Sequence, residues 1–363
     1  MNEDVKYMVF TSCLTYNHGA FIEEAMNGFT IQQTNFPVVY CIIDDASTDN
    51  NAKGIESYVR QNFTFDVSEA YEKKEEYGHV LFARHNTNEN CWFAVILLKE
   101  NHYSKRKPKG QYTLQWRNKS KYVALCEGDD YWTDSMKLQK QVEILEDNPD
   151  CSMVCNRTKL YSEKQNKFIG EQYCISKNGW LNTIDVINRT GLYISTCSII
   201  YRGKWRDEYP DYCKQCLVGD YPLQIFLAMK GKVGYIDDIM SVYRMQNSSS
   251  WSGHQVWFSV SEPMLRTIHS VVTMFEGFQK DYPKYSKCLK AKIANQINRN
   301  MPLRRDRDSI KKYIDFFKPR IKKYSLRWKL DFLLTSSRLP KLRYWNRRWF
   351  LNKYENTQVR YQE

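Results

Sequence analysis

Short apolar runs and amphipathic segments alternate along the first part of the chain. Residues 8–14 and 38–43 are almost continuously apolar, as is typical of strands buried on both faces of a sheet. Between these runs the apolar positions recur at helical spacing, at Phe21, Ile22, Ala25, Met26 and Phe29. The pattern predicts a strand, a helix and a second strand.

The same alternation returns further along the chain. Strands are predicted at residues 122–126 and 196–201, and another strand-like run passes through Val242. Helices are predicted at residues 138–148 and 221–230, the first ended by an Asn-Pro pair and the second closed by a glycine. This order predicts an α/β domain around a largely parallel sheet, with ligands bound at the carboxyl ends of its strands.

Local signals between and beside these elements are weaker. From residue 63 to residue 121 we expect helices and a mobile loop, the loop including a basic stretch at residues 105–109. Asn17 is expected to cap the first helix, and Ser47 and Thr48 are expected to cap the helix after the second strand.

The composition is that of a folded protein of 363 residues, with 42% hydrophobic and 26% charged residues. The length predicts one large domain with an appendage. No apolar run is long enough to span a bilayer, and nothing at the start resembles a secretory signal, so we expect a cytoplasmic protein. The eleven cysteines are odd in number and often lie in apolar runs, which argues against a disulfide framework.

The net charge of +13 is concentrated at the end of the chain. Residues 301–363 contain 18 Lys and Arg but only 6 Asp and Glu, and aromatic residues are interleaved with these cations. Three interpretations stay open for segment 304–350: a solvated basic face, a nucleic-acid patch, and a surface for anionic lipid. The aromatic residues favour the membrane interface, and no nucleic-acid-binding motif accompanies the charge.

Two carboxylate clusters, Asp44-Asp45 and Glu127-x-Asp129-Asp130, each follow a predicted buried strand. Crowded acids repel one another unless a cation lies among them, and Mg²⁺ or Mn²⁺ suits such oxygen ligands. No glycine-rich phosphate loop of either common type is present. The alternative is that these acids only cap helices and shape turns, a role that we assign to the nearby Asp49 and Asp134.

Four segments together resemble the family 2 glycosyltransferases, which are inverting enzymes with the GT-A fold, here of the type that serves bacterial glycan biosynthesis. The resemblance spans residues 5–252, with the segments in the order and at the spacing of that family. The matching segments are TYNHGAFI at 15–22, IDDASTD at 43–49, LCEGDDYW at 125–132, and Gly219-Asp220 followed by Tyr243-Arg244.

The resemblance implies a GT-A domain over residues 1–254, with a Rossmann-like, mostly parallel mixed sheet that binds a nucleotide sugar. Residues 255–363 would form a helical C-terminal region with the basic aromatic tail. The implied activity is metal-dependent inverting transfer, with Mn²⁺ or Mg²⁺, from a nucleoside diphosphate sugar, most often a UDP-sugar. The acceptor would be a hydroxyl of a glycan or lipid-linked glycan, and no nucleic acid is expected as a partner.

Carried over onto matching positions, the resemblance implies a nucleotide site at the ends of the first two strands. Thr15 and Tyr16 would line the nucleotide pocket, and Asp45, helped by Asp44, would hold the base and ribose. Arg84 lies where relatives often contact the nucleotide, with a plain surface arginine as the alternative.

The second acidic segment matches the family's Asp-x-Asp motif, with Glu127 in the place of the first Asp. Asp129 would be the main metal ligand, while Glu127 and Asp130 would bind ribose or metal-bound water. Trp132, just after these acids, either stacks on an acceptor sugar or packs in the core.

Asp220 matches the family's catalytic base, which takes a proton from the acceptor hydroxyl; the alternative is a helix cap. After Arg244 the family often has a histidine, but Met245 and Gln246 stand here instead, and His254 is off register.

Two rival functions remain at this stage. A sugar nucleotidyltransferase also uses metal-bound carboxylates, but the triphosphate loop it needs is not evident. A nucleic-acid or acidic-polymer binding protein would use the basic tail and leave the acids structural. On the favoured interpretation the enzyme is cytoplasmic and lies peripherally on the inner face of the membrane.

Overall fold

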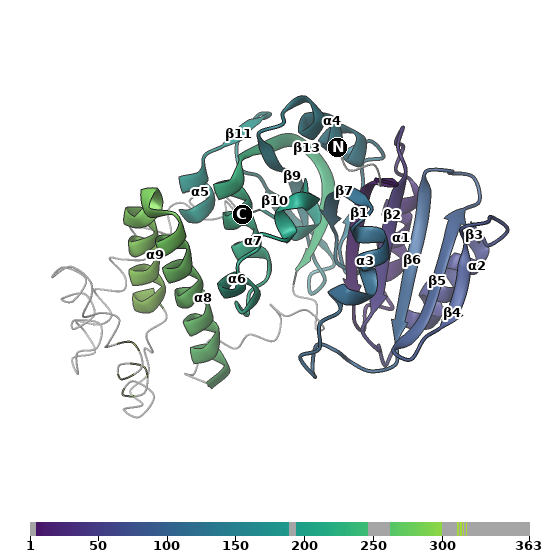
Figure 1. Cartoon of the computed structure of the whole chain (residues 1–363), viewed down its shortest axis with the longest axis horizontal. Coiled ribbons are helices and arrows are strands. Elements are labelled where there is room, and N and C mark those ends of the chain that lie inside the picture. The colour runs from purple at the N-terminus through teal and green to yellow at the C-terminus, as the bar shows by residue number, and fades with distance from the viewer. Residues whose placement is uncertain are drawn as a thin grey trace.

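The structure is a computed structural model that describes residues 5–188, 194–245 and 262–299, together with residues 311, 313, 315 and 317. Within these residues one mixed sheet forms the centre of the molecule (Figure 1). Its strands are β1 (Tyr7–Thr15), β2 (Val38–Asp44), β3 (Phe63–Thr64), β4 (Tyr71–Lys74), β5 (Gly78–His85), β6 (Cys91–Leu98), β7 (Ser120–Leu125), β8 (Tyr131–Trp132), β9 (Cys151–Ser162), β10 (Lys167–Gln172), β11 (Gly179–Leu181), β12 (Ile200–Arg202) and β13 (Lys232–Met245).

Helices lie against both faces of this sheet, as the apolar character of its central strands requires. They are α1 (Ile22–Thr30), α2 (Asn51–Asn62), α3 (Leu114–Arg117), α4 (Lys137–Asp147), α5 (Thr183–Asn188), α6 (Asp211–Lys214), α7 (Asp220–Lys230), α8 (Glu262–Asp281) and α9 (Ser286–Arg299).

The parallel centre of the sheet is the part that positions the acidic segments. β1 pairs in parallel with both β2 and β7, and β2 pairs in parallel with β6. In the β1–β2 register Thr15 lies opposite Asp44, so the carboxyl ends of these strands meet at one edge. The predicted α/β fold with a largely parallel centre is confirmed.

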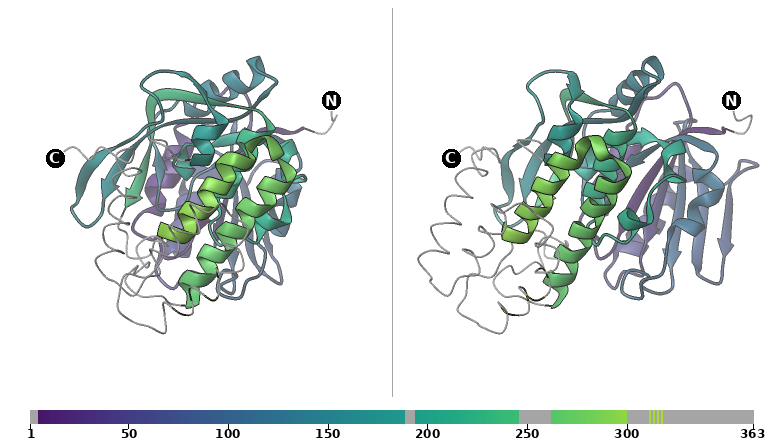
Figure 2. Two further views of the ribbon diagram at one scale, coloured as in Figure 1. Left: turned by 90° about the vertical axis from the view of Figure 1, so that its left-hand side faces the viewer. Right: turned by 60° about the vertical axis from the view of Figure 1, so that its left-hand side comes forward.

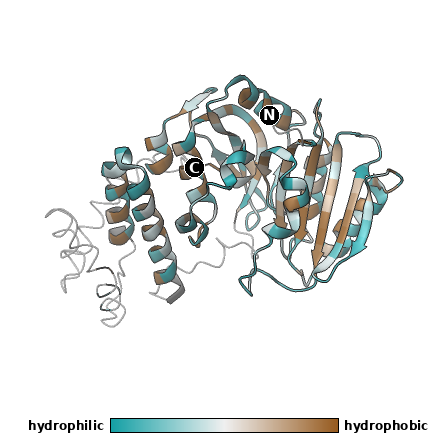
Figure 3. Cartoon of the chain, viewed as in Figure 1, coloured by the Kyte–Doolittle hydropathy of each residue, from teal (hydrophilic) through white to brown (hydrophobic). Residues whose placement is uncertain are grey.

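Every residue of β2 is buried because the two faces of the strand enter different apolar clusters. Val39, Cys41 and Ile43 belong to one cluster, and Val38, Tyr40 and Ile42 belong to the other. α1 and α2 cover the second cluster, while α3 and α7 cover the first. Figure 3 shows the resulting hydrophobic strands between helices whose outer surfaces are largely hydrophilic.

The helices expected between residues 63 and 121 are wrong for the part up to residue 98, which forms the strands β3 to β6. β5 and β6 make an antiparallel hairpin, with Gly78 opposite Leu98 and Arg84 opposite Trp92. A continuous apolar run such as Cys91–Leu98 has no periodicity that separates a buried strand from a buried helix. Only the short η1 (Gly110–Thr113) and α3 are helical between residues 63 and 121.

Two capping predictions are also wrong. α1 begins without a side-chain cap, and Asn17, with a positive φ of 56°, instead accepts the N–H of Thr48 at 2.8 Å. The Ser47 hydroxyl accepts the N–H of Asn17 at 2.9 Å rather than capping α2. These polar residues join the β1–α1 and β2–α2 loops to each other across about thirty residues of sequence.

Asp49 and Asp134 accept N–H groups at the starts of α2 and α4, although neither residue occupies the cap position itself. Asp49 accepts the N–H of Asn51, the first residue of α2, at 2.9 Å. Asp134 accepts the N–H of Met136, just before α4, at 2.7 Å. Both side chains are therefore used at helix starts and stay out of the candidate site.

α8 and α9 form a hairpin at the end of the molecule opposite β4 and β5 (Figures 1 and 2). α8 contacts α6 and α9 contacts α5, so the hairpin shares an apolar cluster with the sheet domain. None of the described helices is long and apolar enough to cross a membrane. All eleven cysteines are free, as the sequence predicted.

Most of segment 304–350 lies outside the described residues, as do Gln246, His254 and the predicted domain boundary at 254. Phe317, an aromatic residue of that segment, is fully buried together with Tyr313 in the cluster that contains α8 and α9. This residue is therefore part of the core and does not contribute to a lipid-facing surface.

Candidate active site

Three carboxylates gather in the acidic loop, residues 126–130, directly after β7. One oxygen each from Glu127, Asp129 and Asp130 can be chosen so that all three lie within 4.8 Å of one another. Gly128 allows this arrangement, because a Cβ at that position would lie 2.6 Å from the side chain of Thr15. The glycine lets the acidic loop sit directly against the end of β1.

The acids of this loop affect one another's ionisation. The Glu127 side chain is exposed, yet desolvation by the protein around it and the charges of Asp129 and Asp220 raise its pKa to about 8. Burial and the neighbouring Asp129 raise the pKa of Asp130 well above its usual range. The buried Oδ2 of Asp130 has no hydrogen-bond partner among the described residues.

This set of oxygens fits a divalent cation. All three side chains offer carboxylate oxygens, which hard ions such as Mg²⁺ and Mn²⁺ prefer, and one buried oxygen lacks a donor. A cation among them would offset the desolvation and the mutual repulsion that raise the pKa values of Glu127 and Asp130. Asp129 would be its central ligand, with Glu127 and Asp130 on either side.

Arg244, at the end of β13, holds the acidic loop in place. Its backbone N–H donates to Asp130 at 2.8 Å, and its guanidinium donates to the carbonyl of Asp129 at 2.8 Å. The same guanidinium pairs with Glu24 of α1 and with Glu163. It lies against the rings of Phe21 and Tyr131. This buried arginine joins α1, β13 and the acidic loop into one unit.

His18, in the loop between β1 and α1, lies beside the acids. Its Nε2 is 3.8 Å from an oxygen of Asp129, and its Nδ1 is buried without a hydrogen-bond partner in the described structure. Burial lowers the pKa of His18, while the charge of Asp129 acts in the opposite direction. No role was predicted for His18 from the sequence, although it lies within the first matching segment.

Asp44, predicted to bind nucleotide, is occupied by its own loop. It accepts the Nδ2 of Asn51 at 2.6 Å and the N–H of Ser47 at 3.0 Å, and it also bonds to the Ser47 hydroxyl. Its carboxylate therefore fixes the β2–α2 connection.

Asp45 is bound to a distant loop. Its two oxygens accept the N–H groups of His102 at 2.7 Å and of Tyr103 at 3.0 Å. The Nζ of Lys109 also donates to it at 2.8 Å, so a buried carboxylate is matched by a mostly buried ammonium group. The contacts of His102, Tyr103 and Lys109 with Asp45 were not predicted from the sequence. The only sequence signal for this loop was the basic stretch at residues 105–109.

Thr15 and Tyr16 do lie at the edge where the acids gather. Thr15 is buried, and its carbonyl accepts the N–H of Asp45 at 3.0 Å, which ties the ends of β1 and β2 together. The Tyr16 side chain that follows is exposed.

Asp220 is the first residue of α7 and is half-buried. Its charge contributes to the raised pKa of Glu127, so the two carboxylates lie close enough to interact. The cap position of α7 is Gly219, and Asp220 accepts the N–H of the adjacent Tyr221 at 2.7 Å, in a contact within the first turn. The structure brings this carboxylate to the acidic loop from the opposite part of the chain.

Trp132 does not line the site, which corrects its assignment to acceptor binding. The side chain is 1% exposed, and its Nε1 donates to the carbonyl of Cys197 at 2.8 Å. One ring face lies 4.3 Å from the Nζ of the buried Lys137, and Phe29 packs edge-on at 5.0 Å. Trp132 therefore packs in the core, which was the alternative given in the sequence analysis.

Arg84 is also separated from the acids. It pairs with Trp92 near the start of β6, whereas the carboxyl end of β6 lies opposite Gly78 at the other end of β5. The antiparallel hairpin therefore carries Arg84 to the far edge of the sheet. The sequence assignment failed because it did not foresee this strand direction.

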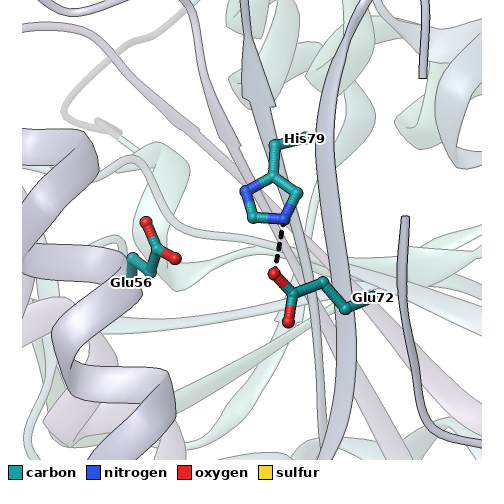
Figure 4. Close-up of side chains that lie close together, drawn as sticks. All are labelled: Glu56, Glu72 and His79. Carbon is teal, nitrogen blue, oxygen red and sulfur yellow. Dashed lines mark hydrogen bonds and ion pairs between the residues drawn. The ribbon is translucent and has the colours of Figure 1, made fainter. Parts of the chain in front are cut away.

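A second acidic group, Glu56, Glu72 and His79, lies on the surface of the β4–β5 sheet edge and α2 (Figure 4). His79 bonds to Glu72 at 2.8 Å, and Arg60 donates to both Glu56 and Glu72 at 2.9 Å. The arginine already neutralises these acids, and it lowers the pKa of Glu72. This group is an exposed ion-pair network.

Comparisons with known proteins add to this geometry. No protein-family model matches the chain. Two mycobacterial proteins, both uncharacterised, are similar in sequence: Rv1520 of Mycobacterium tuberculosis and Mb1547 of Mycobacterium bovis. Each is 25% identical over 272 residues, which cover 74% of this chain and 68% of the relative.

Solved structures of S. aureus TarS resemble the whole chain. TarS 1-349 in complex with UDP superposes with a TM-score of 0.58 at 14% identity, over 97% of this chain and 93% of that one. The complex with UDP-GlcNAc gives 0.59 at the same identity and coverage. The chain has the GT-A glycosyltransferase fold. Ligands of open α/β sheets generally bind at the carboxyl ends of the strands, and the acidic loop follows the carboxyl end of β7.

Proposed function

We propose that this protein is a metal-dependent inverting glycosyltransferase. It transfers a sugar from a nucleoside diphosphate, most often UDP, to a hydroxyl of a glycan or lipid-linked glycan. The observation that carries the proposal is the acidic loop, where Glu127, Asp129 and Asp130 converge within reach of the charge of Asp220. The buried, unpartnered Oδ2 of Asp130 supports a cation there.

Asp129 is the main metal ligand in this proposal, and Glu127 and Asp130 hold metal-bound water or ribose. Bound Mn²⁺ or Mg²⁺ would neutralise the charge that gathers on the diphosphate as the glycosidic bond breaks. Arg244 keeps the loop in position through Asp129 and Asp130. Thr15 and Tyr16 line the nucleotide end of the site, where Asp44 and Asp45 hold the surrounding loops in place.

Asp220 acts as the catalytic base. Its carboxylate accepts the proton of the acceptor hydroxyl as that oxygen bonds to the anomeric carbon of the donor. The bond from that carbon to the diphosphate oxygen breaks on the opposite side, and the nucleoside diphosphate leaves. A single displacement of this kind inverts the anomeric configuration. A carboxylate that is solvent-accessible and sits at the rim of an acidic site suits this role.

The choice of UDP is supported by the fold neighbour, since TarS has been crystallised with UDP and with UDP-GlcNAc. The choice of a membrane-linked acceptor is supported by charge. Residues 282–299 carry five cations and no acid, Lys284, Lys287 and Lys290 are exposed, and the basic segment 304–350 follows them in the sequence. Such a surface would place a cytoplasmic enzyme on the inner face of the membrane.

The proposal is tested by turnover. Purified protein is incubated with a panel of nucleotide sugars and Mn²⁺ or Mg²⁺, with lipid-linked glycans or water as acceptors, and release of nucleoside diphosphate is measured. We expect metal-dependent release from one donor class, abolished by EDTA. A folded protein that releases no nucleotide from any donor would contradict the proposal.

A further inference from the structure

Residues 99–109, the basic loop, have no role in the proposed chemistry so far. The loop leaves the carboxyl end of β6 and carries five cations and one acid, Glu100. Two of these cations, Lys105 and Lys107, pair with Glu100 inside the loop. Because β6 neighbours β2 in the sheet, the loop stands directly beside the end of β2.

Asp45 fixes the conformation of this loop. The carboxylate is 4% exposed and holds two successive backbone N–H groups, those of His102 and Tyr103, along with the Nζ of Lys109. Three donors on two oxygens leave Asp45 little capacity for a further ligand. The buried carboxylate is thus suited to positioning what the loop presents.

The loop presents an exposed aromatic ring. The Tyr103 side chain is 70% exposed although its own backbone N–H is bound to Asp45. The Nζ of Lys109 lies 5.8 Å from the ring centre. A second exposed tyrosine, Tyr16, directly follows Thr15, whose carbonyl accepts the N–H of Asp45. The backbone of Asp45 is therefore bonded to the residue before one exposed tyrosine, and its carboxylate is bonded to the N–H of the other, Tyr103.

We infer that Tyr103 binds the nucleobase of the donor by stacking, and that Asp45 is a positioning residue that holds the basic loop for this purpose. A planar base is the part of a nucleoside diphosphate sugar that an exposed aromatic ring and an adjacent ammonium group recognise. This inference rests on the proposed function, since it assumes a nucleotide donor. It assigns the base to the loop, while the diphosphate lies at the acidic loop.

Calorimetric titration separates the two ends of the ligand. The full chain with Mn²⁺ is titrated with UDP and, separately, with inorganic pyrophosphate, which lacks a base. Tyr103→Ala is expected to weaken UDP binding roughly tenfold and to leave pyrophosphate binding unchanged. Tyr103→Phe keeps the ring and should bind UDP like the wild type. Tyr173→Ala, which removes another exposed tyrosine, is the matched control and should change neither affinity.

Asp45→Asn tests the positioning role. The amide carries no charge to pair with the ammonium of Lys109, so UDP affinity should fall several-fold while pyrophosphate affinity, measured below the melting temperature of the variant, stays near the wild-type value. If Tyr103→Ala binds UDP with wild-type affinity, or loses affinity for UDP and pyrophosphate equally, the inference about Tyr103 is overturned and the proposed function is not. Wild-type protein that binds neither ligand would overturn the proposed function as well.

Discussion

Single carboxylates in this site differ in role because they differ in surroundings. Asp44 and Asp49 are satisfied by nearby N–H groups and shape loops, whereas the acids at 127–130 crowd together and the buried Oδ2 of Asp130 has no hydrogen-bond partner among the described residues. The residue types alone do not separate these cases, which is why Asp44 appeared in the predicted nucleotide site. The discriminating property is the number of donors that reach each oxygen.

Asp220→Asn tests the catalytic base. The amide cannot take the acceptor proton, so kcat should fall by roughly 10²- to 10⁴-fold, whereas UDP affinity should be unchanged. Steady-state kinetics and calorimetry with UDP measure the two quantities. Asp211→Asn is the control, because Asp211 is a strongly exposed acid on the neighbouring α6. An Asp220→Asn enzyme with wild-type kcat would exclude this base.

Glu127 makes the stability of the metal-free protein depend on pH. Its pKa of about 8 in the folded state lies above the ordinary value of 4.5, so the folded state binds this proton more tightly than the unfolded state. Stability from this group is complete below pH 4.5 and is lost as pH rises toward 8. In EDTA at pH 8, Glu127→Gln should therefore melt on the order of 2 °C above the wild type.

At pH 5 the difference between Glu127→Gln and the wild type should largely disappear, because Glu127 is then protonated in the folded state. Thermal denaturation at both pH values measures the effect. A variant that is less stable than the wild type at pH 8 without metal would show that Glu127 is not strained by its neighbours.

Among the elements, the junction of β1 with the acidic loop depends on one glycine. Gly128→Ala places a Cβ 2.6 Å from Thr15, so the loop must move away from β1. We expect a loss of about 1–3 kcal/mol in the free energy of unfolding, with weaker Mn²⁺-dependent UDP binding. Denaturant unfolding and calorimetry measure these changes.

Gly54→Ala is the matched control, since Gly54 lies in α2 with open space where its Cβ would be. It should raise the free energy of unfolding by about 0.5–1 kcal/mol, because alanine favours helix. If Gly128→Ala is as stable and as active as the wild type, the close contact of the acidic loop with β1 is not required.

The helices and strands that were predicted correctly are those with a clear pattern of apolar residues within their own sequence. β1, β2, β7, α4 and α7 have apolar periodicity, and the structure contains all of them. The β5–β6 hairpin was missed because the run Cys91–Leu98 is apolar on both faces. The contacts of Asn17 with Thr48 and of Asp45 with Lys109 join loops 31 and 64 residues apart, and no local pattern encodes them.

The same limit applies to the candidate site. Glu127, Asp129, Asp130 and Asp220 were predicted from motif resemblance, and the structure brings them together. Arg84 was misplaced because its position depends on strand direction. Tyr103 carries no motif, and only the fold puts it beside Asp45.

Over the whole molecule, cations gather at one end of the chain. The exposed lysines of α9 and the basic segment 304–350 should bind the full chain to vesicles with about 30% anionic lipid at low salt. Binding should weaken as salt rises and be absent from neutral vesicles. Co-sedimentation measures the bound fraction. No binding to anionic vesicles at low salt would remove the membrane from the proposal.

The central claim is that the acidic loop binds a divalent cation and the diphosphate of a nucleotide. Calorimetric titration of the wild type and of Asp129→Ala with UDP, each with Mn²⁺ and with EDTA, tests it most directly. The account predicts that the wild type binds UDP only with Mn²⁺ and that Asp129→Ala loses this dependence on metal. UDP binding that is equal with and without Mn²⁺, or unchanged in Asp129→Ala, would contradict it.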